Sequence, residues 1–332
     1  MKHWLAGFLF AVATAVALPV MAQKTVTFAY QDMMNPWRWV QQSQEIEKAT
    51  GYKINWRQFG GGGDVIRAMA SGDVQLGEVG STGIATAISQ GMDVELFWIL
   101  EDIAAAEALV ARNGSGVNTV ADLKGKKIGT PFVSTSHFQL LYAMQKAGLK
   151  PTDAQVLNMR PPEIAAAWER GDIDATFIWD PVLTNVKKNG KVLTTSGDIC
   201  KQGACTFDGL IVTRKFAKEN PAFMVALVKA VAKADADYRA NAKAWTGDQA
   251  KVAAVAKWSG GKPEDVAGSM ALYGFPSLND QASPTWLGGG ANGAAAKALT
   301  QQANFLKEQG RLQTVAPDYS KNVTVEWVAK AM

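Results

Sequence analysis

Short apolar stretches alternate with amphipathic stretches along the part of the chain that follows residue 22. Helices are indicated from Asn35-Pro36 to Ala49 and from Ser81 to about Gln90. The apolar runs between such segments predict strands at 26–30, 52–56, 75–79, 94–100 and 108–112. The run 94–100 is almost continuously apolar, which is typical of a strand that is covered on both faces. This alternation predicts a parallel sheet with helices on both sides.

The same alternation restarts further along the chain. Strands are predicted at 127–129, 154–158, 175–179 and 191–194, with helices between them, so residues 113–204 form a second βα unit inserted into the first. The chain returns at 206–213, and a long helical region follows at 221–244. We therefore expect an α/β fold of two lobes joined by a two-strand hinge. Lobe I is expected to comprise 23–110 and 207–332, and lobe II 111–206. A cleft between two such lobes is a common place for a small ligand, and hinge closure is the expected motion.

The first 22 residues have the pattern of a secretory signal peptide. Lys2 and His3 form a short basic start, and an uncharged apolar run extends from Trp4 to Leu18. Val20-Met21-Ala22 offers small residues at the first and third positions before a cleavage point. An uncleaved anchor is the alternative, although the apolar run is short for a membrane span. We therefore expect cleavage after residue 22 and export from the cytoplasm.

Composition narrows the functional classes. The net charge of +4 is small and dispersed along the chain, which argues against a nucleic-acid-binding surface. The 31 glycines and 48% hydrophobic residues fit a soluble α/β protein with a large core. Gly60–Gly63 resembles a phosphate-binding loop only loosely, because no Gly-Lys-Ser/Thr follows it. We interpret it as a loop that lets the backbone approach the cleft, or as a tight turn.

The chain has two cysteines, Cys200 and Cys205, which lie close together. In an exported protein such a pair indicates a disulfide that closes a small loop. The alternative is a metal site, which normally needs more ligands, and the histidines His3 and His137 are the other candidates. We favour the disulfide and predict no metal.

The segment from Gly129 to His137 reads as a strand end, a hydroxyl-rich loop and a helix start. Backbone N–H groups at a helix start lack partners within the helix, and the helix dipole adds positive charge there. The hydroxyls of Ser134, Thr135 and Ser136 beside these groups suit a permanently ionised anion. The alternative is an ordinary helix cap, since Ser and Thr are usual capping residues.

Four segments together carry a resemblance to a known family. They are Gly129–His137, Pro161–Ala175, Thr206-Phe-Asp208 and Phe305–Gly310. With them the chain resembles, over about residues 24–322, the nitrate/sulfonate/taurine group of periplasmic solute-binding proteins. The resemblance implies a type II periplasmic binding protein fold, a Gram-negative periplasm, and delivery of the ligand to an ABC transporter permease with its ATPase. It also implies no catalysis, and we expect a monomer without a cofactor.

The resemblance implies taurine (2-aminoethanesulfonate) as the ligand, a zwitterion with a sulfonate at one end and an ammonium at the other. A sulfonate offers three acceptor oxygens and needs several donors. Two predicted helix starts supply candidates, provided that both face the cleft. His137 adds a donor if neutral or a charge if protonated, or it simply packs at the helix start. The candidate residues at the two helix starts are Ser81, Thr82, Thr135, Ser136 and His137.

The ammonium end needs a carboxylate or aromatic faces. Asp208 is the first candidate, because it matches the aspartate that follows Thr-Leu or Thr-Phe in the taurine receptors; its alternative role is a structural strand-edge carboxylate. Glu78 and Asp180 are candidates because the carboxyl ends of strands face the ligand crevice in open sheets. Trp179 is expected to cover the ethylene carbons, and Gln31 follows the first strand toward the ligand.

Glu78 and Asp180 depart from the family pattern, because close taurine receptors can carry non-acidic residues at these positions. Three carboxylates exceed what one ammonium requires. One of them could therefore pair with Arg160 or face a contact between the lobes, or the ligand could have a larger cationic end.

Three alternatives to a taurine receptor stay open at the sequence level. One is a receptor for another aliphatic or amino sulfonate. Another is an extracytoplasmic sensor partner that docks on a receptor kinase. The third is an enzyme on the same fold, against which stand the predicted signal peptide and the absence of a Ser-His-Asp or metal constellation in the sequence.

Overall fold

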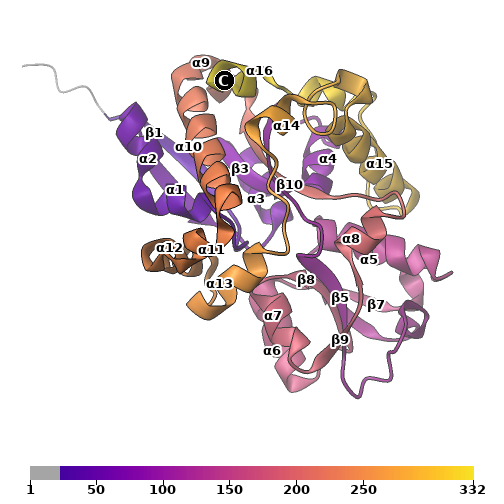
Figure 1. The fold of residues 1–332 in the computed structure, drawn as a ribbon. Coiled ribbons are helices and arrows are strands. Elements are labelled where there is room, and N and C mark those ends of the chain that lie inside the picture. The colour runs from indigo at the N-terminus through magenta and orange to yellow at the C-terminus, as the bar shows by residue number, and fades with distance from the viewer. Residues whose placement is uncertain (1–22) are drawn as a thin grey trace, which may run out of the picture.

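Two lobes make up the molecule, and the chain passes between them more than once (Figure 1). The structure is a computed structural model that describes residues 23–332. The predicted signal peptide lies outside the described residues. Within residues 23–332, no helix combines the length and apolar character needed to cross a membrane.

Lobe I is built on a five-stranded mixed sheet with the order β2-β1-β3-β10-β4. Strands β1 and β3 and strands β1 and β2 pair in parallel, whereas β10 is antiparallel to both of its neighbours. The strands are β1 (Thr25–Tyr30), β2 (Lys53–Gln58), β3 (Leu76–Gly80), β4 (Val94–Asp102) and β10 (Phe207–Thr213).

Lobe II repeats this arrangement with the order β7-β6-β8-β5-β9. Here β5 is the antiparallel strand, between β8 and β9. In each lobe the antiparallel strand is the one that arrives from the other lobe, so the chain enters both sheets in the same way. The strands are β5 (Glu107–Arg112), β6 (Lys127–Thr130), β7 (Gln155–Asn158), β8 (Ala175–Trp179) and β9 (Gly190–Thr195).

The predicted two-lobe α/β fold is confirmed, with corrections to the sheets and to one lobe boundary. The apolar run 108–112 belongs to the sheet of lobe II, so the first crossing falls between β4 and β5 at 103–106 and not at 110/111. The prediction of a purely parallel sheet is also wrong, because β5 and β10 are antiparallel. An apolar run shows that a strand is buried and leaves open which sheet it joins and in which direction.

Helices cover both faces of each sheet (Figure 1). The predicted helix up to Ala49 is broken at Gln44, which has a left-handed φ of 55° and ends one helix before the next begins. The helices are α1 (Trp37–Ser43), α2 (Glu45–Thr50), α3 (Gly62–Ala70), α4 (Ser81–Ser89), α5 (Thr135–Lys146), α6 (Pro161–Arg170), α7 (Val182–Lys187), α8 (Ser196–Cys200), α9 (Arg214–Glu219), α10 (Pro221–Ala240), α11 (Ala242–Gly247), α12 (Gln249–Ser259), α13 (Pro263–Met270), α14 (Leu278–Ala282), α15 (Ala294–Glu308) and α16 (Glu326–Ala331).

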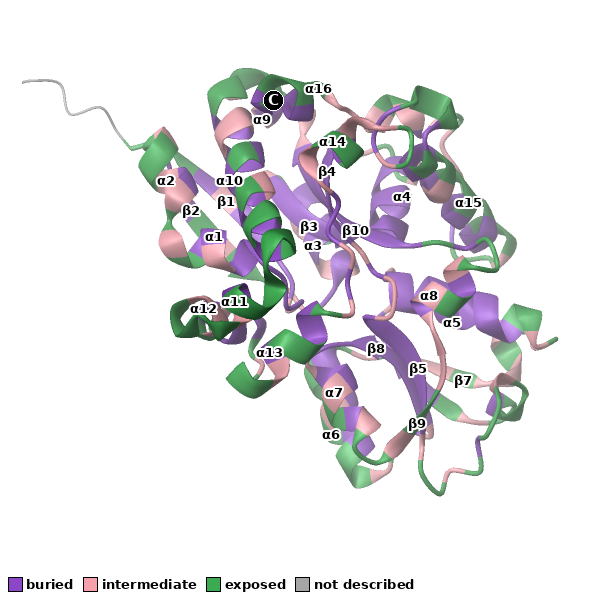
Figure 2. Ribbon diagram, viewed as in Figure 1, coloured by how far each residue is buried: buried purple, intermediate pink, exposed green. Residues whose placement is uncertain are grey.

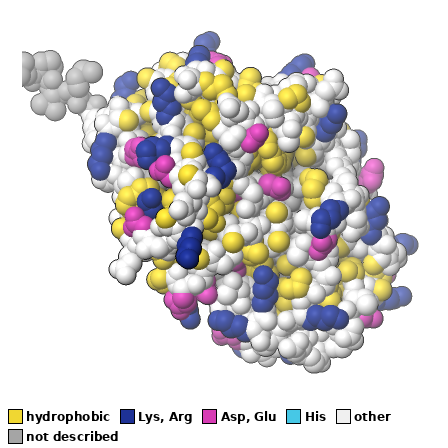
Figure 3. Space-filling view, viewed as in Figure 1, with side chains coloured by type: hydrophobic (Ala, Val, Ile, Leu, Met, Phe, Trp, Pro, Cys, Tyr) yellow, Lys and Arg dark blue, Asp and Glu magenta, His cyan; other side chains and the backbone are white. Residues whose placement is uncertain are grey.

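The central strands of both sheets are buried, as Figure 2 shows in purple, whereas the edge strands β2, β7 and β9 are partly exposed. Lobe I packs large side chains such as Phe28, Trp37 and Trp98 between its sheet and helices. Aromatic contacts join the lobes: Phe305 of α15 packs on Phe138 and Tyr142 of α5, with ring centroids 5.1 Å and 5.9 Å apart. On the face shown in Figure 3, Lys and Arg side chains are scattered and do not form one basic patch.

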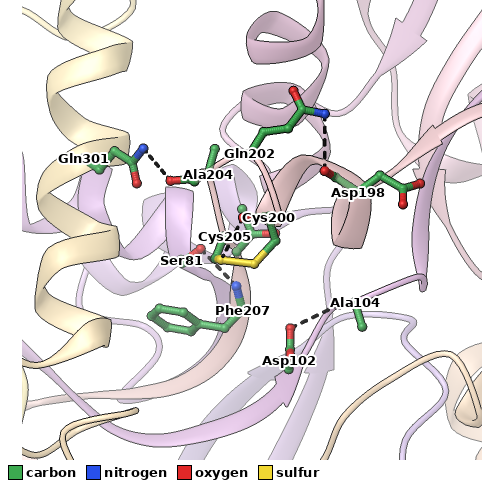
Figure 4. Close-up of a disulfide and its surroundings, with 12 residues drawn as sticks. Ser81, Asp102, Ala104, Asp198, Cys200, Gln202, Ala204, Cys205, Phe207 and Gln301 are labelled. Carbon is green, nitrogen blue, oxygen red and sulfur yellow. Dashed lines mark hydrogen bonds between the residues drawn. A yellow bond between two sulfur atoms is a disulfide. The ribbon is translucent and has the colours of Figure 1, made fainter.

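Cys200 and Cys205 form a disulfide beside the second crossing (Figure 4). The loop that it closes is held against α15, because Gln301 donates to the carbonyl of Gly203 at 2.8 Å and Gln302 to that of Cys205 at 3.1 Å. The disulfide therefore fixes the short segment that leads from α8 of lobe II into β10 of lobe I.

Candidate functional site

A small cavity lies between the lobes, where strand ends from both sheets meet. The carboxyl ends of β1, β3 and β8 reach this edge, and the antiparallel strands β5 and β10 bring their first residues to it. The free volume inside is about 10 Å³, enough for about one water molecule. A larger ligand therefore enters only when the lobes separate. The lining residues are Gln31, Met33, Gly62, Gly80, Glu107, Ser134, Thr135, Trp179, Asp208 and Tyr273.

Asp208 contributes a buried carboxylate to this cavity from the start of β10. Its side chain is 5% exposed, and no hydrogen bond to it is present among residues 23–332. Burial, together with the charges of Glu101, Glu107 and Glu78, raises the pKa of Asp208 well above its usual value. A cation placed in the cavity would oppose this shift, because it favours the ionised carboxylate. The structure thus puts the first sequence candidate for the ammonium end in contact with the cavity.

Glu107 is a second cavity carboxylate, which sequence reasoning missed. It opens β5, and it accepts hydrogen bonds from Thr135 Oγ1 at 2.5 Å and Ser196 Oγ at 3.2 Å. Burial raises the pKa of Glu107 to about 7, against the opposing effect of these hydroxyls. The sequence did contain a signal that could have identified Glu107. An acidic residue stands at the first position of an apolar strand, where burying a carboxylate without a partner costs free energy.

The start of α5 faces the cavity with its cap residues. Ser134 Oγ accepts a hydrogen bond from the backbone N–H of His137 at 3.1 Å, so the ordinary cap is present. The hydroxyl of Thr135 is committed to Glu107. Ser136 Oγ is buried and lies near enough to Glu107 to help lower the pKa of that carboxyl, but it forms no hydrogen bond of regular geometry among the described residues. Ser134 and Thr135 line the cavity, and Ser136 lies directly beside them in the first turn.

His137 is neutral in this structure. Its ring stacks on Phe132 with centroids 4.2 Å apart, and burial, aided by the charge of Arg311, lowers its pKa to about 3. Its Nε2 atom has no hydrogen-bond partner among residues 23–332. Of the roles considered from the sequence, the protonated one is incompatible with this pKa, whereas the neutral donor and the packing role both remain compatible with it. His137 itself does not line the cavity.

The hydroxyls of Ser81 and Thr82 are directed away from the cavity, contrary to our expectation. They donate to Gln302 Oε1 of α15 at 3.0 Å and 2.7 Å. Ser81 Oγ also accepts from the backbone N–H of Phe207, which ties α4 to the start of β10 (Figure 4). The part of this helix start that lines the cavity is the backbone at Gly80.

Glu78 also departs from the prediction, because it is paired inside lobe I. Its Oε1 lies 2.6 Å from Nη2 of Arg38, and both side chains are completely buried. Its Oε2 accepts from Arg38 Nη1 and from Trp37 Nε1, each at 2.9 Å. The same guanidinium donates to the carbonyls of Gln31 and Met33, so the pair holds the cavity-lining loop after β1. Glu78 thus supports the site without lining it.

Asp180 and Trp179, although adjacent, have different positions. Asp180 accepts from the backbone N–H of Thr184 at 2.7 Å and starts α7, away from the cavity lining. Trp179 lines the cavity from lobe II, and its Nε1 donates to Asp32 of lobe I at 2.6 Å. Burial raises the pKa of Asp32 to about 6. Gln31 lines the cavity and donates to the carbonyl of Glu78 at 3.0 Å.

Arg160 is paired with Asp64 and not with one of the candidate carboxylates. Its Nε lies 3.0 Å from Oδ2 of Asp64, at an exposed position. Asp64 belongs to α3 of lobe I, and Arg160 precedes α6 of lobe II, so the ion pair bridges the lobes. The adjoining glycine run brings Gly62 to the cavity wall. Among residues 23–332, no three His, Cys, Asp or Glu side chains are arranged to hold a metal ion.

Comparison with known proteins places this geometry in context. The taurine-binding periplasmic protein of Escherichia coli (strain K12) is 38% identical over 303 residues, which are 91% of this chain and 92% of that protein. The periplasmic aliphatic sulphonate binding protein SsuA from Escherichia coli shares the fold, with a TM-score of 0.69, 24% identity, and coverage of 92% of each chain. The desulfurization enzyme DSZB also shares it, with a TM-score of 0.61, 15% identity, and coverage of 93% of this chain and 99% of that one.

The family assignment rests on a match of residues 48–244 to the family described as NMT1/THI5 like, which is more than half of the chain. The relative from Escherichia coli covers nearly the whole length of this chain at an identity well above the level that shows the fold alone. The two-lobe topology and the interlobe cavity agree with both findings. The chain belongs to the NMT1/THI5-like family.

Proposed function

We propose that this protein captures taurine between its two lobes and delivers it to an ABC importer. The observation that carries the proposal is the buried carboxylate of Asp208, which has no hydrogen-bond partner among residues 23–332 and lies in the same cavity as the start of α5. The cavity combines carboxylates, which suit a cation, with a helix start, which suits an anion, and taurine carries both charges. The name of the 38% identical relative, a taurine-binding periplasmic protein, supports the same ligand.

The sulfonate end is bound at the start of α5. The backbone N–H groups of its first turn lack partners within the helix, and the dipole of this 12-residue helix favours an anion there. The unpartnered Ser136 hydroxyl and neutral His137 suit an acceptor that stays ionised at every physiological pH. Gly80, from the start of α4 in lobe I, lets the opposite backbone approach the ligand.

The ammonium end is bound by Asp208 of lobe I and Glu107 of lobe II. A cation between them forms charge-assisted hydrogen bonds with both lobes and relieves the repulsion between the two carboxylates. Trp179 covers the ethylene carbons, because its ring lines the cavity and its Nε1 is fixed by Asp32. Binding and closure are therefore coupled: the ligand joins two lobes that otherwise repel each other at this point.

A thermal-shift titration of refolded protein (residues 23–332) with taurine, ethanesulfonate, β-alanine and sulfate tests the proposal. Refolding removes any ligand carried through purification. Taurine should raise the unfolding free energy by about 2.7 kcal/mol at a hundredfold excess over its dissociation constant. Ethanesulfonate and β-alanine each lack one charged end and should stabilise less. A response to ethanesulfonate with none to taurine would move the ligand to simple sulfonates, and no response to any of the four would contradict the proposal.

Asp208→Asn tests the ammonium site directly. The substitution removes the charge and keeps the shape, so taurine affinity should fall by about thirtyfold or more. Ethanesulfonate affinity should not fall. Asp172→Asn, at an exposed acid of lobe II, is the matched control and should bind taurine like the natural protein. Isothermal titration calorimetry measures all three, and an unchanged taurine affinity in Asp208→Asn would make this carboxylate structural.

The proposal has three further parts. The protein binds its ligand without catalysis, it acts in the periplasm, and it is a monomer. The predicted signal peptide and the compartment named for the relative support the location. The fold itself does not decide between receptor and enzyme, since a desulfurization enzyme shares it. Recovery of taurine unchanged after long incubation with the protein is the expected result, and release of sulfite would identify an enzyme.

A further inference from the structure

Asp208 has a second carboxylate as its direct neighbour on the sheet. In the antiparallel pairing of β10 with β4, Asp208 lies opposite Glu101, next to a register irregularity between Asp208 and Gly209. Residues that are directly opposite on such strands point to the same face, with Cβ atoms about 5 Å apart, and like charges in this position repel. Glu101 is completely buried. Both strands belong to lobe I, so the pair persists whether the lobes are open or closed.

Little in the described structure neutralises this pair. Asp208 accepts no hydrogen bond among residues 23–332, and Glu101 accepts only from the amide nitrogen of Asn35, at 3.3 Å to each oxygen. The guanidinium of Arg38 is committed to Glu78 and to neighbouring carbonyls. The buried hydroxyl of Tyr273, whose side chain lines the cavity with Asp208, has no partner among the described residues.

The surroundings of the pair are strongly acidic. Burial and the neighbouring carboxylates raise the pKa of both Asp208 and Glu101 well above their usual values. Arg38 is the cation that opposes this shift for both groups, and it does not balance the acids around it. The titratable and charged groups that face the pair or its neighbour Tyr273 are Arg38 from α1, Glu78 from β3, Glu107 from β5, Asp180 after β8, Asp235 from α10 and Tyr273 itself, after α13.

On the basis of the proposed function, we propose that Glu101 is a positioning residue that acts through Asp208. The two adjacent carboxyls share one proton in the ligand-free site, and the ammonium of the ligand displaces that proton to solvent. The exchange leaves the net charge of the site unchanged, because one positive charge replaces another. It also makes the site selective, since a ligand without a cation leaves the shared proton in place.

The proposal predicts opposite pH dependences for two ligands. Taurine affinity should fall as pH falls, by up to about tenfold per pH unit, because protons compete with the ammonium. Ethanesulfonate keeps its sulfonate but has no ammonium, so its affinity should not fall and should rise toward low pH. Calorimetry in two buffers of different ionisation enthalpy should report a proton released on taurine binding in the range where the affinity changes.

Glu101→Gln is the decisive variant, with Glu95→Gln as its matched control on the same strand. Without its charged neighbour, Asp208 holds a proton less strongly, so the fall in taurine affinity should move to lower pH and fewer protons should be released on binding than in the natural protein. Glu107, whose pKa is raised to about 7, accounts for the release that remains. Glu95 bonds Trp327 at the opposite end of β4, and its variant should keep the natural profile. Glu101→Asp keeps the charge and serves if the glutamine variant does not fold.

The outcomes separate this proposal from the proposed function. Taurine binding whose heat is independent of the buffer and whose pH profile is the same in Glu101→Gln would overturn the role of Glu101 and leave the receptor intact. A protein that binds taurine at no pH would overturn the proposed function itself. Opposite pH slopes for the two ligands, with the fall in taurine affinity moved to lower pH in Glu101→Gln, would support both.

Discussion

The buried carboxylates of this protein differ in their hydrogen-bond and ion-pair partners. The carboxylate of Glu78 meets a guanidinium and an indole N–H, whereas that of Asp208 meets neither. A buried ion pair is held in place by the cost of separating it, because either charge alone would be stranded without water. Glu78 is therefore a structural residue of the loop after β1, and Asp208 is available to a ligand.

Glu78→Gln should destabilise the fold by about 3–5 kcal/mol, because it leaves Arg38 buried and unpaired. Urea unfolding measures this. The double variant Arg38→Met with Glu78→Leu should recover most of the loss, because it removes both charges. If Glu78→Gln unfolds at the same urea concentration as the natural protein while its taurine binding is lost, the residue contacts ligand after all.

Glu107 should make the ligand-free protein less stable as pH rises. Its pKa is raised from 4.5 to about 7, so between these values the folded protein holds a proton that the unfolded chain has lost. The stabilising contribution is complete below about pH 4.5 and is lost as pH rises through 7, by about 3 kcal/mol in all.

The test compares urea midpoints of the natural protein and Glu107→Gln at about pH 5 and about pH 8, without taurine. The natural protein should lose more stability between the two values than the variant does. Equal losses would show that Glu107 ionises in the folded protein as readily as in the unfolded chain.

Sequence patterns located the strand ends that carry the acids but not the partners of those acids. Asp208, Glu78 and Asp180 each lie at an end of an apolar strand, and nothing local distinguishes them. They differ in their contacts with residues that are distant in the sequence. Glu78, for example, contacts Arg38, which lies forty positions before it. Glu107 was missed for the related reason that its strand was assigned to the wrong sheet.

At the level of elements, the starts of α4 and α5 approach each other across the cleft. A Cβ atom on Gly80 would lie 2.9 Å from Cγ2 of Thr135 and 3.1 Å from Oδ1 of Asp208. Thr135 has little freedom to move, because its hydroxyl is bonded to Glu107. The absent side chain at position 80 is thus what allows the two helix starts to come this close.

Gly80→Ala should therefore block full closure and leave each lobe folded. Its backbone has an ordinary φ of −64°, so alanine adds no strain of its own. We expect taurine affinity to fall by about tenfold or more, since the clash is relieved by keeping the lobes apart. Gly247→Ala, where a Cβ meets nothing within 4 Å, is the control. Equal affinities by calorimetry for the two variants would contradict the proposed closed geometry.

The sequence predicted most elements, because apolar periodicity reports burial directly. It did not predict the direction of β5 and β10, since a strand that is buried on both faces has the same composition in either orientation. The break between α1 and α2 was missed as well. Gln44 adopts a left-handed conformation that glycine or asparagine normally signals, and glutamine gives no such cue.

For the whole molecule, closure is held at the cleft mouth by contacts between lobes. The Asp64–Arg160 ion pair and the Trp179–Asp32 hydrogen bond both join lobe I to lobe II. The first is exposed and contributes little by itself, whereas the second is partly buried and involves Trp179 of the cavity wall. Opening must break both, so the residence time of the ligand depends on them.

Arg160→Ala should speed taurine release by less than about fivefold and leave association nearly unchanged, since surface ion pairs are weak. Stopped-flow tryptophan fluorescence follows release through Trp179. Arg67 pairs with the same Asp64 from within α3, so Arg67→Ala is the control that keeps the interlobe contact. High salt should remove the difference between the two variants, and a difference that persists in salt would require another explanation.

The buried Arg38–Glu78 pair also has an evolutionary consequence. Each residue makes the other indispensable, so a lineage that changes one of them first passes through a less stable protein. Descendants of this chain should therefore keep both residues or exchange both together. Across a large set of relatives, positions 38 and 78 should covary more strongly with each other than either does with the residues of the cavity wall.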